Sequence, residues 1–313
     1  MIRRLLLCAE AALLLATACR AQTAHASFWR TTPADSLLAE QILADLRDCS
    51  TALVPYQMCI AAGDLLGQPY VAGTLEETES EQLAIYLTRT DCILFVETCM
   101  ALARTSLLSG DFATLAAELQ ASRYRDGQVR CYADRLHYTS EWIMQAERRG
   151  VLREITAELG GIPYDHPVSF MSTHPEAYPR MDDVEAIRAA EARINAVPVC
   201  IIPKEKVAGI LPKLRPGDIL CFAASMKGLD ILHVGIAIAG GEIPGQAGDD
   251  ENAGVGHDGK PKAGDQAAAP MRFIHASSAA GKVIVDPKTI PAYLEGRKSI
   301  AGVRVLRPNP LPF

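Results

Sequence analysis

A change in sequence pattern near Pro198 constrains the fold of this chain more than any other feature. Before it, apolar residues recur at helical spacing, and glycine- and proline-rich loops separate the segments. After it come short runs bounded by glycine and proline, typical of strands. The five runs expected to be strands are Asp218 to Ala223, Ile231 to Ala239, Met271 to Ala276, Lys282 to Asp286 and Val303 to Leu306. Several connections are too short for crossover helices, which predicts an α+β fold with a mostly antiparallel sheet.

The helical part begins with a recognisable start signal. Thr32 can cap a helix, Pro33 suits its first turn, and Asp35 follows three residues after the cap. A second helix is expected from about residue 52 to 66, and both are interpreted as core scaffold. The later candidate helices are Phe112 to Ala121, Ser140 to Arg149 and Val184 to Asn195.

Length and charge exclude some classes of protein. The 313 residues, 49% of them hydrophobic and 22% charged, are enough to bury a core in one large domain or two small ones. The formal net charge is −6 and no basic stripe is present, so nucleic acid is not expected as a partner.

Residues 1–26 resemble an export signal. Arg3 and Arg4 precede an apolar run from Leu5 to Ala18, which is too short to span a bilayer stably. The small residues Ala24 and Ala26 offer a cleavage site, whereas the sequence before Cys19 resembles a weak lipobox. We therefore expect a periplasmic or cell-envelope protein that contacts the membrane only if Cys19 is lipidated.

The cysteine count leaves the redox state open. Of nine cysteines, removal of Cys8 and Cys19 leaves seven, an odd number that permits one free reactive thiol or several unpaired buried ones. The sequence contains neither a CxxC pair nor an HExxH motif, so no metal site and no cofactor are expected.

Cys92 stands at the start of a predicted helix running from about Thr90 to Leu108. Asp91, like Thr90, is a residue type that caps helices. The cysteine sulfur would then lie at the positive end of the helix, where the thiolate is favoured. The alternative is a small core residue, which is our interpretation of Cys99 two turns further along the same face.

Two of the seven histidines lie inside predicted strands, where a rigid scaffold can orient them: His233 and His275. The alternative for each is a core histidine satisfied by backbone hydrogen bonds. Along the run from Ile231 to Ala239, bulky apolar residues alternate with His233, Gly235 and Ala237. We expect the face with small residues to receive the Cys92 helix.

Residues 240–270 interrupt the predicted sheet. The segment is full of Gly, Asp, Pro and Ala, and it joins two strands that would otherwise form a hairpin. Such a composition buries little apolar surface, so a flexible insertion is expected.

Several motifs, taken together, resemble a known superfamily. They are Gly67-Gln68-Pro69-Tyr70, Asp91-Cys92, Pro216-Gly217-Asp218-Ile219, His233-Val234-Gly235-Ile236 and His275-Ala276-Ser277-Ser278. In order and spacing they are similar to the NlpC-type, papain-like bacterial cell-wall hydrolases. The match is closer to the N-acetylmuramoyl-L-alanine amidase branch, long catalogued as a domain of unknown function, on the strength of further pieces. Those pieces are Thr74-Leu75-Glu76, Phe95-Val96-Glu97, Tyr138 to Trp142, Phe170-Met171-Ser172 and Leu229-Asp230.

The resemblance implies roles for individual residues. Cys92 would be the nucleophile, His233 the base and acid, and His275 the residue that orients His233. Tyr70 would lie near the oxyanion, and Asp91 would help to place the substrate, although capping alone explains it.

The resemblance also implies a fold and an activity. Residues 27–313 would form one papain-like domain in which the nucleophile-bearing helix packs on an antiparallel sheet, with extra helices. The substrate would be peptidoglycan or a muropeptide, cleaved between N-acetylmuramic acid and L-alanine. Two alternatives stay open, a γ-D-glutamyl endopeptidase of the stem peptide and a non-catalytic muropeptide-binding envelope protein. The oligomeric state is not indicated.

Overall fold

The computed structural model describes residues 29–49, 51, 53–181, 183–240 and 271–311. The predicted export segment with Cys19, and the predicted flexible insertion beyond Gly240, lie outside the described residues. Within the described part, no helix has both the length and the apolar character needed to cross a membrane.

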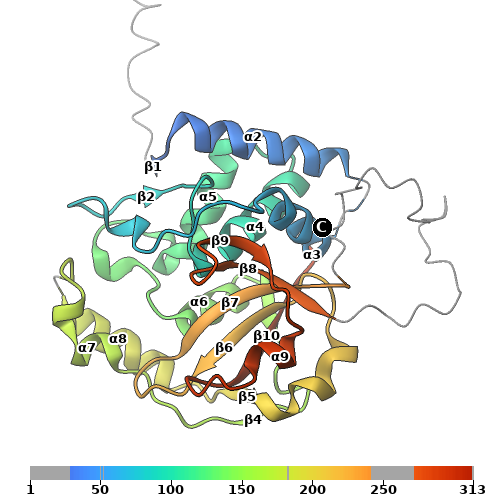
Figure 1. The fold of residues 1–313 in the computed structure, drawn as a ribbon. Helices are drawn as coiled ribbons and strands as arrows, with labels where there is room; N and C mark the ends of the chain where they lie inside the picture. The colour runs from blue at the N-terminus through green and yellow to red at the C-terminus, as the bar shows by residue number, and fades with distance from the viewer. Residues whose placement is uncertain (1–28, 50, 52, 182, 241–270, 312–313) are drawn as a thin grey trace, which may run out of the picture.

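Four helices form a layer on one side of the molecule (Figure 1). They are α2 (Pro33–Asp48), α3 (Val54–Asp64), α4 (Cys92–Leu107) and α5 (Phe112–Arg123). The predicted start of α2 is confirmed: Thr32 accepts a hydrogen bond from the Asp35 backbone N–H at 3.2 Å and donates to the Asp35 carboxylate at 2.6 Å. This capping box satisfies backbone groups that a helix end otherwise leaves unpaired.

A sheet forms the second layer, and its neighbouring strands pair in the order β4-β5-β10-β6-β7-β8-β9, every pair antiparallel. Their bounds are β4 Ile162–Pro163, β5 Cys200–Pro203, β6 Ile219–Ala224, β7 Ile231–Ile238, β8 Arg272–Ser277, β9 Lys282–Val285 and β10 Ile300–Pro308. In addition, β3 (Leu152–Glu154) pairs with the end of β10, and β1 (Trp29–Arg30) forms a separate parallel pair with β2 (Leu83–Ala84). The five predicted strands and the antiparallel α+β architecture are confirmed.

Further helices surround the sheet. One block of helices consists of α6 (Thr139–Arg148), α7 (Phe170–Thr173) and α8 (Val184–Asn195), with α7 and α8 near the edge of the view (Figure 1). Helix α9 (Ile290–Leu294) follows β9 in the sequence and packs against the sheet. The short 3₁₀ segments are η1 (Thr74–Glu76), η2 (Arg125–Gly127), η3 (Tyr132–Asp134), η4 (Pro175–Ala177) and η5 (Lys204–Lys213).

Separate hydrophobic clusters cover the two faces of the central strands. On one face, Val234 and Ile236 of β7 belong to the same cluster as Phe95 and Cys99 of α4. On the other, Phe222, Ala237 and Phe273 pack with Tyr293 of α9 and with η5. Helix α4 therefore covers the bulky apolar face of β7.

The expectation that α4 packs on the small-residue face of β7 is therefore wrong. Burying the larger apolar side chains gains more free energy, so they face the helix layer. The small residues serve the other face. A Cβ on Gly235 would lie 2.7 Å from the Phe273 ring and 3.2 Å from the Cβ of His275. Glycine at this position lets the His275 strand and its side chains come close to β7.

Candidate active site

Cys92 is the first residue of α4, and Asp91 is its N-cap, as the sequence predicts. The Asp91 carboxylate accepts a hydrogen bond from the Leu94 backbone N–H at 3.0 Å. Thr90, the other candidate cap, is buried and donates its hydroxyl to the Asp91 carbonyl oxygen at 3.0 Å. The cap fixes where the helix begins and therefore where the Cys92 side chain points.

The surroundings of Cys92 favour the neutral thiol. Burial raises the pKa of Cys92 to about 12, and the negative charge of Asp91 acts in the same direction. Backbone hydrogen bonds from Val234, from Ile93 and from Cys92 itself oppose the rise without cancelling it. The N–H groups at the helix start thus lower the pKa of the thiol as expected, but desolvation outweighs their effect.

His233 and His275 contact each other directly. His233 Nε2 lies 2.6 Å from His275 Nδ1, and the two rings meet edge to face. His275 Nε2 in turn lies 3.2 Å from Asp286 Oδ2, in a bent contact. The structure thus brings the two predicted histidines together and adds a carboxylate behind them.

Both imidazoles are held neutral. Burial lowers the pKa of His233 to about 3, with smaller contributions from His275 and from the positive charge of Arg297. Burial also lowers the pKa of His275, against the opposing effect of Asp286. The shifts of these pKa values therefore favour a resting state in which the Cys92 thiol and both imidazoles are neutral.

Tyr293 of α9 lies near both histidines and was not predicted from the sequence. Its ring centroid lies 6.4 Å from that of His233 and 5.9 Å from that of His275. Burial raises the pKa of its hydroxyl, and the charges of Asp286 and Cys92 add to the rise, so the tyrosine is within electrostatic range of both. Nothing in the short run Ile290 to Leu294 marks it out in the sequence.

Asp286 was also missed as a site residue. It ends the predicted strand from Lys282, and its backbone N–H donates to the Phe273 carbonyl oxygen at 2.9 Å. The β8–β9 hairpin register therefore brings it beside His275. A polar residue at the end of a hairpin strand was the available signal.

Tyr70 lies beside the start of α4. Its backbone N–H donates to the Gly281 carbonyl oxygen at 2.9 Å, and the flanking residues bond to Thr90. Burial raises the pKa of the Tyr70 hydroxyl, and the charges of Cys92 and Asp91 contribute further. The predicted proximity of Tyr70 to Cys92 is thus present in the structure, with the hydroxyl protonated at neutral pH.

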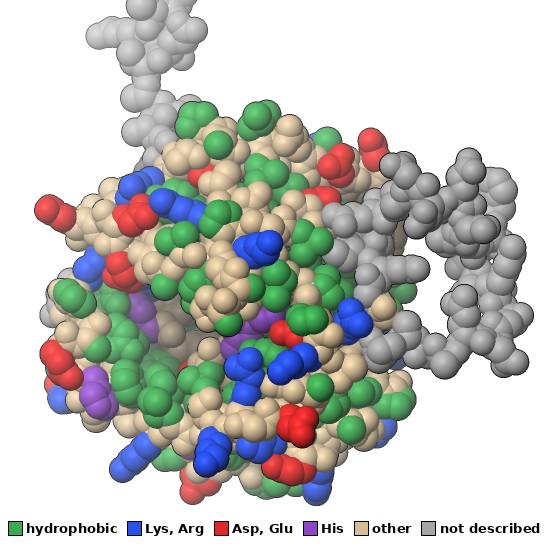
Figure 2. All heavy atoms as spheres, viewed as in Figure 1, with side chains coloured by type: hydrophobic (Ala, Val, Ile, Leu, Met, Phe, Trp, Pro, Cys, Tyr) green, Lys and Arg blue, Asp and Glu red, His purple; other side chains and the backbone are tan. Residues whose placement is uncertain are grey.

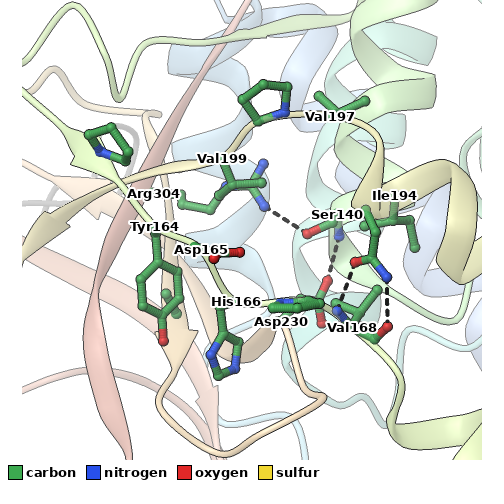
Figure 3. Close-up of a pocket in the computed structure, with 15 residues that line it drawn as sticks. Ser140, Tyr164, Asp165, His166, Val168, Ile194, Val197, Val199, Asp230 and Arg304 are labelled. Carbon is green, nitrogen blue, oxygen red and sulfur yellow. Dashed lines mark hydrogen bonds between the residues drawn. The ribbon is translucent and has the colours of Figure 1, made fainter.

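A cavity of about 320 Å³ opens on the α4 side of the sheet (Figure 3). Arg304 Nη1 donates to the Ser140 hydroxyl at 2.7 Å, and the Ser140 backbone N–H donates to Asp230 at 2.6 Å. On another wall the rings of Tyr164 and His166 stack, 4.9 Å apart. The cavity therefore combines a polar floor with an aromatic wall.

The cavity and Cys92 belong to the same face of the sheet. Arg304 pairs with Cys221 across β10 and β6, and Cys221 pairs with Val234 across β6 and β7. A backbone hydrogen bond links Val234 to Cys92, so Arg304 on the cavity floor lies two strands away from the strand that contacts Cys92, about 10 Å between the strand axes. In the space-filling view the molecule is hollowed, with histidine side chains at the edge of the hollow (Figure 2).

All seven cysteines that the structure describes are free. Cys59, Cys99 and Cys221 are buried, and Cys92, Cys49, Cys131 and Cys200 are partly accessible. Among these, only Cys92 is the first residue of an α-helix.

Comparisons with known proteins relate the chain to one family. The model of the N-acetylmuramoyl-L-alanine amidase-like family, AmiA-like, matches residues 61–245. That span includes Tyr70, Cys92 and His233 and ends before His275. No match to the chain is found among curated proteins.

Solved structures with a similar fold cover most of the chain. An N-acetylmuramoyl-L-alanine amidase from Bacteroides uniformis is 29% identical, covers 82% of this chain and 99% of its own, and has a TM-score of 0.68. A Bacteroides fragilis protein provisionally described as a xylanase is 33% identical over 79% of this chain and 99% of its own, with a TM-score of 0.63. A Legionella pneumophila protein of the DUF1460 family, 18% identical over 88% of this chain and 95% of its own with a TM-score of 0.59, shares the fold.

The family model spans more than half of the chain, and the similar structures are covered almost completely. The chain therefore belongs to the N-acetylmuramoyl-L-alanine amidase-like family, a group of amidase-like hydrolases whose substrate is of the peptidoglycan type.

Proposed function

We propose that this protein is a cysteine-dependent N-acetylmuramoyl-L-alanine amidase with an NlpC-type, papain-like fold. The observation that carries the proposal is the row of contacting side chains His233, His275 and Asp286. The next residue after His233, Val234, hydrogen-bonds through its backbone to Cys92. A nucleophile, a base and a group that orients the base are the parts that acyl transfer needs.

In the proposed reaction, His233 acts on the Cys92 thiol as a general base. Its Nε2 is engaged by His275, which leaves Nδ1 to take the proton from sulfur. The sulfur attacks the lactyl carbonyl of the sugar, and the imidazolium then donates the proton to the departing L-alanine amine. Water, activated by the same imidazole, hydrolyses the thioester and restores the thiol.

The surrounding groups stabilise the charges that develop. The hydroxyl of Tyr70 remains protonated, and it can donate to the oxyanion of the tetrahedral intermediate. As His233 becomes positive, it donates through Nε2 to His275, whose own N–H faces the Asp286 carboxylate. We assign Asp91 mainly to capping, because its carboxylate bonds to the helix backbone.

The cavity of Figure 3 supports an amidase over the alternatives. It offers a polar floor and an aromatic wall on the same side of the sheet as α4, and it has room for a sugar unit. The endopeptidase alternative would use the same catalytic residues. A non-catalytic binder would not need the histidine pair.

The test is to incubate the purified protein with muropeptides and to weigh the products. Free stem peptide and free saccharide are expected, and Cys92→Ala should abolish their release while leaving the fold intact. Release of a fragment that retains L-Ala-D-Glu on the sugar would favour the endopeptidase. Absence of any cleavage would leave only the binding protein.

We further propose that the protein is exported to the periplasm or cell envelope. The proposal rests on the sequence of residues 1–26 alone. Cell fractionation of the full chain and of a Cys19→Ala variant separates simple export from lipid anchoring, because only the lipidated form would move from the membrane to the soluble fraction on substitution.

A further inference from the structure

Arg297 is a cation fixed beside the candidate active site. Its guanidinium carbon lies 3.9 Å from the centroid of the Tyr293 ring, and its Nε donates to the Tyr293 carbonyl oxygen at 2.8 Å. Stacking on an aromatic face and one backbone bond together orient the guanidinium plane.

The two outer nitrogens of this guanidinium remain available. Among the described residues, Arg297 forms no ion pair with a carboxylate. The residue is exposed, and in the space-filling view Lys and Arg side chains lie beside the histidine surface near α9 (Figure 2). A planar fork of donors of this kind matches a carboxylate in two-point contact.

Arg297 is also close to the reacting groups. Its charge lowers the pKa of both His233 and His275, and one aromatic ring, Tyr293, separates it from their imidazoles. Tyr293 in turn feels the charge of Cys92. We therefore place the free guanidinium nitrogens of Arg297 within the length of one or two substrate residues from the scissile bond.

The proposed substrate carries a carboxylate at that distance from the scissile bond. In the stem peptide, L-alanine is followed by D-glutamate, whose α-carboxylate is free because the chain continues through its γ-carboxyl group. Two extended residues span about 7 Å. Arg297 is not among the residues that line the cavity of Figure 3, so the proposed site for the carboxylate is separate from the space proposed for the sugar.

We propose that Arg297 binds the α-carboxylate of the D-glutamate residue on the leaving-group side of the substrate, and so makes the enzyme select stem peptides that carry this charge. The inference rests on the proposed amidase function and adds a specificity-determining residue to it.

The test uses two substrates that differ in one group, N-acetylmuramoyl-L-alanyl-D-glutamate and N-acetylmuramoyl-L-alanyl-D-isoglutamine, in which an amide replaces the α-carboxylate. We expect the unmodified enzyme to cleave the glutamate form with a kcat/KM about ten- to a hundredfold higher. Arg297→Ala should bring the two values together, and Arg297→Lys should restore part of the difference.

The comparison of substrates separates binding from an effect on the histidines. Loss of the Arg297 charge from His233 and His275 changes the cleavage of both substrates by the same factor, so only a carboxylate contact changes their ratio. Lys298→Ala, which removes an exposed neighbouring cation, is the matched control and should retain the preference.

Three outcomes overturn the inference, and they are distinguishable. Equal cleavage of both substrates by the unmodified enzyme contradicts the role of Arg297 and leaves the amidase proposal standing. A preference that persists in Arg297→Ala assigns the recognition to another residue. Cleavage of neither substrate contradicts the amidase proposal and the inference with it.

Discussion

At the scale of single residues, burial determines the protonation states of the Cys92 thiol and the His233 imidazole. Cys92 and His233 are both shifted by burial toward their neutral forms. Proton transfer would then accompany the attack of sulfur, so the enzyme would not depend on a preformed ion pair. His275 and Asp286 then stabilise the positive charge that His233 acquires during the reaction.

Asp286 supplies the negative charge for this stabilisation. Replacing it by Asn keeps the shape and an acceptor for the Lys288 backbone N–H, which now donates to Asp286 at 2.8 Å, but removes the charge that faces His275. We expect kcat to fall about tenfold or more with little change in KM, because the group acts through His275 on the transition state.

Steady-state kinetics on a muropeptide, together with the urea midpoint of unfolding, would check this prediction. The unfolding midpoint controls for a purely structural effect. An unchanged kcat in a folded Asp286→Asn variant would show that the contact with His275 has no part in the reaction.

At the scale of elements, the start of α4 combines two functions in Asp91. The side chain caps the helix, and its charge raises the pKa of the neighbouring Cys92 thiol. These functions are separable, because asparagine also caps helices and carries no charge.

Asp91→Asn should therefore keep the stability and lower the pKa of the Cys92 thiol, whereas Asp91→Ala should lose about 1 kcal/mol of unfolding free energy. The rate of alkylation by iodoacetamide as a function of pH reports the thiol pKa, and chemical unfolding reports the stability. Should both variants alkylate with the pH dependence of the unmodified protein, the charge of Asp91 would have no influence on the sulfur.

The same elements show what local sequence predicts. The Thr32 and Asp91 caps were predictable, because a cap is recognised from a few adjacent residues. The face of β7 that receives α4 was not, since alternation separates two faces without saying which one meets the helix. Asp286 and Tyr293 were missed because hairpin register and the packing of α9 bring them to the site from distant parts of the sequence.

At the scale of the whole molecule, several buried histidines make stability depend on pH. Burial lowers the pKa of His137 and of His233 to about 3. Unfolding lets each take up a proton near pH 6.5, so the unfolded state binds more protons below that pH, and stability falls as the pH falls toward 3. The slope is about 1.4 kcal/mol per pH unit for each histidine.

A substitution at His137, which lies apart from the active site and bonds through Nε2 to the Tyr132 carbonyl oxygen, isolates one such contribution. His137→Gln should unfold with a shallower loss of stability between about pH 6 and pH 4 than the unmodified protein. Urea unfolding at several pH values measures both slopes. Parallel pH profiles for the two proteins would mean that His137 is protonated in the folded state.

The hydrogen bond between Ser140 and Asp230 connects helix α6, which borders the cavity, to strand β7, which carries His233. Helix α6 has no side-chain cap of its own at Tyr138, and the buried carboxylate at the start of β7 supplies one instead. This hydrogen bond therefore fixes the start of α6 to the start of the strand that carries His233. The loop bearing Tyr164 and His166 contacts the same connection between β6 and β7, through the carbonyl oxygens of Ala224 and Met226, so a change in this loop would also reach the start of the strand that carries His233.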